Sequence, residues 1–133
     1  MTNFNIFFDV GAHKGESIKL FLKNFKIKEI FSFEASPINF EILKDKELSL
    51  KKKFSNTNIK VENKALGSIS GQKVILNQMR ESSSSTINQI DKNSKYFKRK
   101  FKFLNLFNKD NVFKPIEIEL DTLSNYILIN KIK

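Results

Sequence analysis

The chain has 133 residues with one histidine and no cysteine, and its 24 lysines and arginines against 14 acidic residues give a formal net charge of +10. This length suits a single domain, and the composition excludes disulfides and thiolate metal sites and gives no basis for a zinc site. No apolar run reaches the roughly 18 to 20 residues of a membrane span, and the first residues lack a signal-peptide pattern, so we expect a cytoplasmic protein.

The first half of the chain alternates between strand and helix patterns. An apolar run at residues 5–8 stops at Asp9 and a glycine turn, as buried strands do. Apolar residues recur at helical spacing from Ile18 onward, and Ser36 followed by Pro37 is typical of a helix start. We predict strands over residues 5–8, 30–33 and 59–61 and helices over residues 16–25 and 37–50. This β-α-β-α-β order implies a parallel sheet with right-handed crossovers.

The second half of the chain has a different pattern. Residues 73–77 read as a strand after a glycine turn, and in "PIEIEL" apolar residues alternate with acidic ones, which predicts another strand. We expect these strands to form an antiparallel pair at the edge of the parallel sheet. The stretch over residues 79–114, polar and then basic, reads as a mobile insertion within one α/β domain spanning residues 1–133.

The loop after the first predicted strand has the features of a ligand site. Backbone N–H groups of such a loop, and the start of the following helix, favour a carboxylate or phosphate. Gly11 supplies the turn and a close backbone approach, Gly15 allows tight packing at the helix start, and Asp9 is placed to hold an ammonium group or a water. Glu34 follows Gly15 by 19 residues, where nucleotide-binding folds place the acid that binds both ribose hydroxyls.

The glycine spacing decides between nucleotide cofactors. "DVGAHKGE" has only G-x-x-x-G, and Ala12 and His13 stand where a dinucleotide-binding loop needs room for the pyrophosphate, so NAD is disfavoured. No Lys-Ser or Lys-Thr pair follows Gly15, so the phosphate-binding loop of many ATP-binding proteins is absent.

Five segments are spread along nearly the whole chain: "FDVGAHKGES", "FSFEASPINFEIL", "NKALGSISGQKVIL", "SSSST" and "IELDTL". Together they resemble the FkbM-type family of class I S-adenosylmethionine-dependent methyltransferases. The resemblance implies a partial Rossmann-like fold with a parallel β-α-β-α-β core and an added strand pair, and S-adenosyl-L-methionine as cofactor. Members of this family methylate an oxygen, commonly a sugar hydroxyl in glycan, glycolipid or secondary-metabolite synthesis, so the acceptor implied is a small molecule or a glycan.

The same resemblance implies which residues bind the cofactor. The residues around its amino-acid end would be Asp9, Gly11, Ala12, His13 and Gly15. Glu34 would bind the ribose hydroxyls, and Ala35 would lie near the adenine. The residues that would flank the base from the end of the third strand are Asn63, Lys64 and Ala65.

No residue stands out as the catalytic base. Methyl transfer to a hydroxyl needs an aligned acceptor and the removal of a proton. We expect His13 to contact the ligand or cap the helix in the cofactor loop rather than to act as this base. In the family, "LDTL" is followed by a helix and a further strand with acidic residues, and here the chain stops at "SNYILINKIK". We therefore expect the cofactor-binding half of a methyltransferase. Three readings stay open: a truncated reading frame, a split gene, or a fragment that needs a partner chain to supply the strand beside residues 5–8.

The sequence leaves two other functions open. One is a non-catalytic S-adenosylmethionine-binding remnant, or a module that works only with a partner. The other is an RNA methyltransferase in which the positive charge and the Phe97–Phe107 segment hold RNA, although the scattered lysines make nucleic acid the less favoured partner. The "SSSST" run reads as a linker or as part of the acceptor side, and Asp121 is expected to cap a helix that starts at Thr122.

Overall fold

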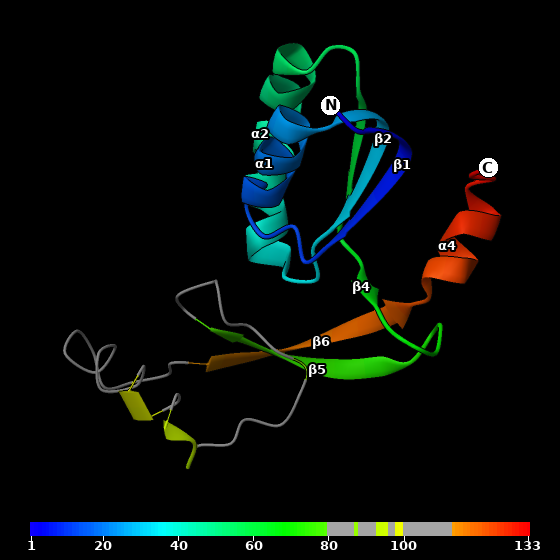
Figure 1. The fold of residues 1–133 in the computed structure, drawn as a ribbon. Helices are drawn as coiled ribbons and strands as arrows, with labels where there is room; N and C mark the ends of the chain where they lie inside the picture. The colour runs from blue at the N-terminus through cyan, green and yellow to red at the C-terminus, as the bar shows by residue number, and fades with distance from the viewer. Residues whose placement is uncertain (80–86, 88–92, 96–97, 100–112) are drawn as a thin grey trace. The chain divides into compact units, whose positions relative to one another are not determined.

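The computed structural model describes residues 1–79, 87, 93–95, 98–99 and 113–133 (Figure 1). The chain forms two compact units, Met1–Lys73 with Ile118–Lys133, and Val74–Glu117. Most of the insertion predicted over residues 79–114 lies outside the described residues, as do the "SSSST" run and most of the Phe97–Phe107 segment.

The first unit contains a parallel sheet of strand order β1-β2-β3. Its strands are β1 (Asn3–Val10), β2 (Lys26–Phe33) and β3 (Asn58–Glu62). The predicted parallel arrangement is confirmed. Strand β2 begins four residues before the predicted start at residue 30, because the exposed Lys26 and Lys28 interrupt the apolar run from which that start was predicted.

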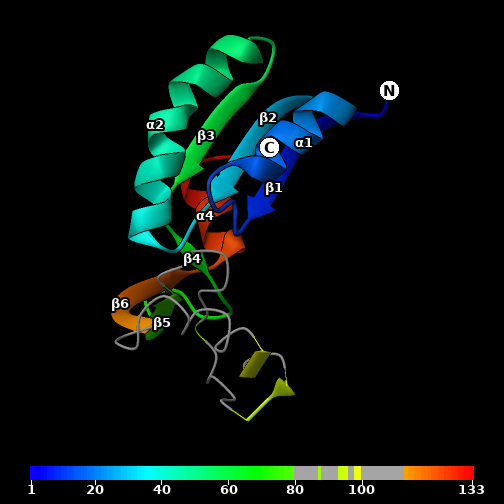
Figure 2. The same ribbon diagram turned by 90° about the vertical axis from the view of Figure 1, so that its left-hand side faces the viewer.

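Helices α1 (Glu16–Asn24) and α2 (Pro37–Lys53) lie together against one face of this sheet (Figure 2). The predicted start of α2 is confirmed, since Ser36 Oγ accepts a hydrogen bond from the main-chain N–H of Asn39 at 3.2 Å and Pro37 occupies the first turn. The core between helices and sheet consists of buried aliphatic side chains, chiefly Ile18, Leu22, Ile30, Leu43, Leu50, Ile59 and Val61.

Helix α4 (Leu123–Ile129) covers the other face of the sheet. Its buried Tyr126 packs edge-on against the Phe33 ring, with 4.8 Å between the ring centroids. The Tyr126 hydroxyl donates a hydrogen bond to Glu62 Oε1 at 2.9 Å. Helix α4 is therefore attached to both β2 and β3, and the sheet lies between helices in an α/β arrangement.

A second sheet has the strand order β4-β6-β5, with β4 (Ala65–Leu66), β5 (Lys73–Met79) and β6 (Phe113–Asp121). The expectation that the last two strands attach to the edge of the parallel sheet is wrong. The short strand β4, which the sequence pattern did not reveal, pairs in parallel with β6 through Ala65↔Leu120 and Leu66↔Asp121. Strands β5 and β6 therefore form a separate sheet together with β4.

Strand β1 is an edge strand in the described structure. Among the described residues it pairs only with β2, on one side. Its apolar residues Ile6, Phe7 and Phe8 are only half-buried, and Val10 is 61% exposed. The sheet therefore ends on a long, largely apolar strand.

Candidate functional site

The loop between β1 and α1 is bound to the end of β2. The main-chain N–H groups of Gly11 and Ala12 both donate to the carbonyl oxygen of Phe33 at 2.9 Å. Gly11 has a φ of 85°, a left-handed conformation that favours glycine, and no atom lies within 4 Å of a Cβ built there. The first turn of the loop thus stays close to the sheet and leaves open space beside Gly11.

Gly15 lies where the loop meets helix α2. Its φ is 84°, and an added Cβ would lie 3.0 Å from Leu43 Cδ1. Gly15 is the N-cap residue of α1, and its main-chain N–H donates to the carbonyl oxygen of Ala12 at 2.8 Å. A glycine therefore lets α1 start in close contact with α2.

The Glu34 carboxylate joins the loop to the start of α2. Its Oε2 accepts a hydrogen bond from the main-chain N–H of His13 at 2.8 Å, and its Oε1 accepts one from the main-chain N–H of Ser36 at 2.9 Å. The Glu34 main-chain N–H also donates to the carbonyl oxygen of Glu62 at the end of β3, at 3.0 Å. Glu34 is only 7% exposed, so its carboxylate is held in one place by the backbone around it.

Asp9 is the second acidic residue at this edge of the sheet. Its Oδ2 accepts hydrogen bonds from Ser17 Oγ at 2.6 Å and Ser32 Oγ at 3.5 Å. Burial raises the pKa of Asp9, and the two serine hydrogen bonds oppose this only in part. The sequence analysis did not identify Ser17 or Ser32 as site residues. Ser32 could have been found, because a serine within the apolar "IFSF" of β2 indicates an inward polar contact.

His13 lies at the beginning of helix α1. Its Nδ1 is 3.3 Å from Glu16 Oε2, and the same oxygen accepts from the main-chain N–H of Lys14 at 3.1 Å. Its φ of 51° places the residue in the left-handed region. The His13 ring therefore lies beside the first turn of α1, in contact with Glu16.

The end of β3 contributes Asn63 to the same edge. Its Nδ2 donates to the carbonyl oxygens of Glu34 at 2.8 Å and Ala35 at 3.4 Å. Asn63 thus holds the residues that follow β2. The structure brings together the loop residues, Glu34 and Ala35 as the sequence analysis grouped them.

Lys64 and Ala65 lie in a different group of contacts. Lys64 Nζ is 3.1 Å from Asp121 Oδ2, and Ala65 is paired with Leu120 of β6. Asp121 also accepts hydrogen bonds through Oδ1, from Asn125 Nδ2 at 2.8 Å among others. Neither Lys64 nor Ala65 has a described hydrogen bond to the loop over residues 11–15.

Asp121 does not cap helix α4, contrary to the sequence expectation. Thr122 is the N-cap, since its Oγ1 accepts from the main-chain N–H of Asn125 at 3.0 Å. Asp121 is the last residue of β6, one position before the N-cap. Its Oδ1 accepts a hydrogen bond from the main-chain N–H of Thr122 at 2.8 Å, and its carboxylate also bonds to Asn125, Lys64 and the Ser70 hydroxyl. These hydrogen bonds, that of Asn125 foremost, lower the pKa of Asp121 to about 2.

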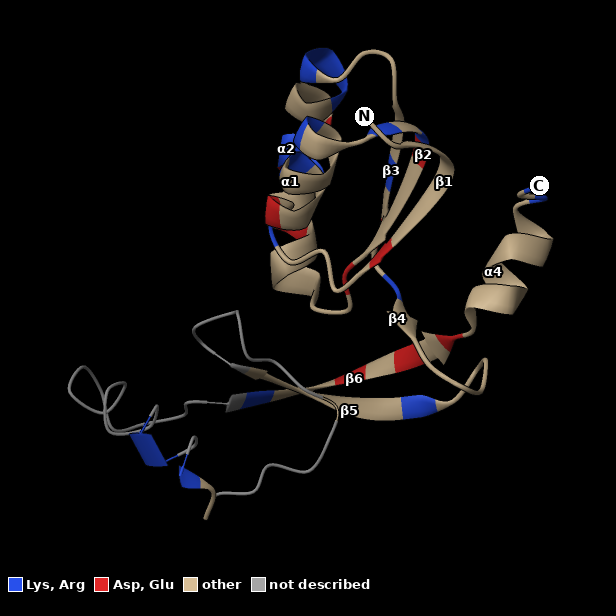
Figure 3. Cartoon of the chain, in the orientation of Figure 1, with Lys and Arg blue, Asp and Glu red and all other residues tan. Residues whose placement is uncertain are grey.

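The charges of the first unit are unevenly placed. Figure 3 shows acidic residues at the carboxyl ends of β1 and β2, whereas lysines are spread over α1 and α2. A ligand at this edge would meet the Asp9 and Glu34 carboxylates, both less than 10% exposed. Such a site favours ligands that carry hydrogen-bond donors or positive charge over ligands that carry phosphates.

Among the described residues, no group of three or more His, Asp or Glu side chains is arranged to hold a metal ion. None of the helices described is long and apolar enough to cross a membrane. Comparison of the chain with protein-family models, with curated proteins and with solved structures found no match.

Proposed function

We propose that this chain binds S-adenosyl-L-methionine at the carboxyl ends of β1 and β2 and is the cofactor-binding part of an FkbM-like methyltransferase. The observation that carries the proposal is the position of Glu34. A buried carboxylate follows the second parallel strand and is hydrogen-bonded to the glycine loop that follows the first. Ligands of open α/β sheets bind at this edge, with an acid on the ribose hydroxyls.

The residues present suit this cofactor. Each oxygen of Glu34 accepts one main-chain hydrogen bond, and a carboxylate oxygen has a second lone pair for a ribose hydroxyl. The described hydrogen bonds of Asp9 go to Oδ2, which leaves Oδ1 for the ammonium group of the methionine part. The open space beside Gly11 gives the ligand a close approach to the loop.

When bound, the cofactor supplies a methyl group activated by its sulfonium. The acceptor we propose is a hydroxyl of a sugar or another small molecule, which has to be aligned with that methyl and lose a proton. The residues of this edge bind and orient the cofactor. The His13 ring contacts Glu16 at the start of α1, so we do not assign His13 as the base that removes this proton. We propose instead that a partner chain supplies the groups that hold the acceptor.

The free edge of β1 supports a partner that adds a strand to the sheet. Natural edge strands are usually short or carry charged residues that prevent unwanted pairing. Strand β3 follows this rule, with five residues that include Lys60 and Glu62. Strand β1 has eight residues, no lysine and no proline, so its free edge suits pairing with a further strand.

Calorimetric titration with S-adenosyl-L-methionine tests the proposal. Wild-type protein should bind with one site per chain, and Glu34→Gln should bind about 5- to 100-fold more weakly, because a ribose hydroxyl loses its acceptor. Glu29→Gln is the matched control, since Glu29 lies on the same strand and hydrogen-bonds Asn58 on the protein surface. Equal affinity of wild type and Glu34→Gln would remove Glu34 from the site.

The other two functions have less support. Most of the Phe97–Phe107 segment lies outside the described residues, and nothing in the described part favours RNA as a substrate. A cofactor-binding remnant without activity would share the site proposed above. Cofactor binding without methyl transfer in the presence of a strand-supplying partner would identify it.

A further inference from the structure

A cavity of about 570 Å³ lies at the end of the first unit opposite to Glu34. Its lining comes from the amino ends of the parallel strands, including Asn3 and Lys26, and from the turn after α2, including Phe54 and Thr57. Because β1 and β2 run in parallel, their amino ends lie at the edge of the sheet away from the glycine loop. The cavity is thus separate from the proposed cofactor site. Its volume is within the range of small-molecule sites.

The lining combines aromatic rings with positive charge. Phe4, Phe25 and Phe54 contribute rings, and the charged side chains among the described lining residues are Lys26, Lys28 and Lys53. No acidic residue belongs to the described lining. A cation would meet repulsion here, whereas an anion with an apolar part would find both of its halves matched.

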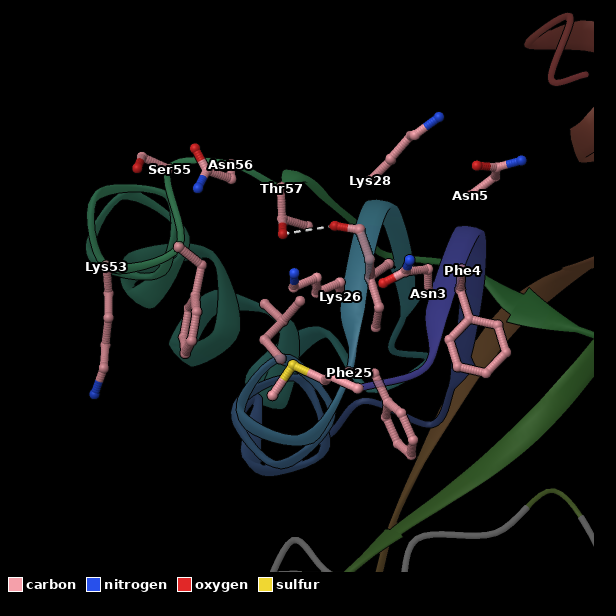
Figure 4. A pocket seen from close by; sticks show the side chains of 14 residues that line it. Asn3, Phe4, Asn5, Phe25, Lys26, Lys28, Lys53, Ser55, Asn56 and Thr57 are labelled. Carbon is pink, nitrogen blue, oxygen red and sulfur yellow. Dashed lines mark hydrogen bonds between the residues drawn. The ribbon is translucent and has the colours of Figure 1, made fainter.

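Lys26 is the central cation of this cavity. In Figure 4 its amine points toward the middle of the lining residues, whereas the side chains of Lys28 and Lys53 extend outward. None of the three lysines forms an ion pair within the described part of the chain, although four other lysines do. The ammonium group of Lys26 is therefore available to a ligand.

The dipoles of α1 and α2 explain the positions of two of the three lysines in the lining. The negative end of the α2 dipole favours Lys53 in its last turn, and the end of α1 at Asn24 favours Lys26 in the same way. Lys28 lies further along β2, beyond the last turn of either helix. Lysines that only stabilise the carboxyl ends of helices would also have no need to line a cavity with aromatic walls.

We infer that this cavity binds a small organic anion that joins a flat apolar group to a carboxylate or phosphate. The ring of the ligand packs against Phe25 and Phe54, and its anionic group contacts Lys26. The hydroxyl of Thr57 donates to the carbonyl oxygen of Ile27 at 2.7 Å, which fixes the turn that forms one wall. Phosphate alone lacks the apolar contact, and an uncharged aromatic compound lacks the contact with Lys26.

Titration of ¹⁵N-labelled full-length protein with phenyl phosphate, followed by NMR, tests this inference. Amide signals of residues 26–28 and 54–57 should shift with saturation, while those of residues 11–15 should not. Inorganic phosphate and benzyl alcohol should each bind much more weakly. Lys26→Gln should weaken binding by about five-fold, the effect of losing one partly exposed charge contact. Lys26 is exposed, so this variant should fold.

The matched control is Lys23→Gln, which removes an exposed lysine of α1 that is not part of the cavity. It should bind phenyl phosphate as the wild type does. Absence of saturable shifts at residues 26–28 and 54–57 would overturn the inference, and so would an equal loss of affinity in Lys23→Gln and Lys26→Gln. The shifts map to the opposite edge of the sheet from Glu34, so the outcome is independent of cofactor binding.

Discussion

The side-chain carboxylate of Glu34 and the main-chain N–H of His13, 21 residues apart in the sequence, are joined by a hydrogen bond of 2.8 Å. The other oxygen of the same carboxylate accepts from the main-chain N–H of Ser36. A buried N–H without an acceptor is costly, so this single side chain stabilises both the glycine loop and the start of α2. The loop therefore has its shape before any ligand binds.

This double role predicts an effect of Glu34→Gln on stability without any ligand. The amide nitrogen of glutamine cannot accept a hydrogen bond, so one of the two main-chain N–H groups loses its partner. The free energy of unfolding should fall by about 1–3 kcal/mol in urea denaturation. Glu29→Gln, at a half-buried position of the same strand away from the loop, should change it by less than about 0.5 kcal/mol. A Glu34→Gln protein as stable as the wild type would contradict the role of this carboxylate in the loop.

Substitution of Gly15 should separate backbone conformation from packing. Gly15→Ala places a side chain at a φ of 84° and 3.0 Å from Leu43 Cδ1. Gly71→Ala meets a similar φ of 80° but has no atom within 4 Å, so it reports the backbone effect alone. We expect a loss of about 1–2 kcal/mol for Gly71→Ala and about 1–3 kcal/mol more for Gly15→Ala, from thermal or urea unfolding. Equal losses would show that α1 and α2 are not closely packed at Gly15.

Tyr126 should reveal how helix α4 is held on the sheet. Tyr126→Phe keeps the ring packed on Phe33 and removes the hydrogen bond to Glu62, which should cost about 0.5–1.5 kcal/mol of unfolding free energy. Tyr126→Ala also removes the ring and should cost about 3–5 kcal/mol. If both variants were equally unstable, the ring packing described here would contribute nothing.

Asp121 should make stability depend on pH in acid. The hydrogen bond from Asn125, together with those from Lys64 and Ser70, holds the folded-state pKa at about 2, below the ordinary value of 3.8. The folded state therefore binds fewer protons than the unfolded state between these values, and the stabilisation present above about pH 4 is lost as the pH falls toward 2. Asp121→Asn should lack this part of the pH dependence when unfolding is followed from neutral to acidic pH.

The comparison of wild type with Asp121→Asn isolates this residue. Glu47, whose pKa is also below its ordinary value, titrates in both proteins and cancels in the difference. A difference in unfolding free energy that stays constant from pH 4 to pH 2 would contradict the carboxylate's ionised contacts with Asn125 and Lys64.

Elements with strong local signals could be predicted from the sequence. The apolar run before Asp9 and the cap and proline at Ser36 and Pro37 located β1 and the start of α2, because each signal acts within a few residues. The parallel order of the three strands followed from the alternation of strand and helix patterns.

Contacts between distant residues were harder to predict. Strand β4 has only two residues and exists because β6 pairs with it, some 55 residues later in the sequence, so no local pattern marks it. Asp121 and Thr122 are both good cap residues, and only the extent of β6 decides between them. The aromatic and basic cavity at Lys26 is formed by three separate segments, none of which carries a recognisable motif.

NMR titration of the ¹⁵N-labelled chain with S-adenosyl-L-methionine tests most directly whether the cofactor binds at the carboxyl ends of β1 and β2. We expect saturable shifts of the amide signals of residues 9–15, 34–36 and 63, with the signals of residues 26–28 and 54–57 unchanged. Absence of binding at millimolar cofactor, or shifts confined to residues outside this edge of the sheet, would contradict this expectation.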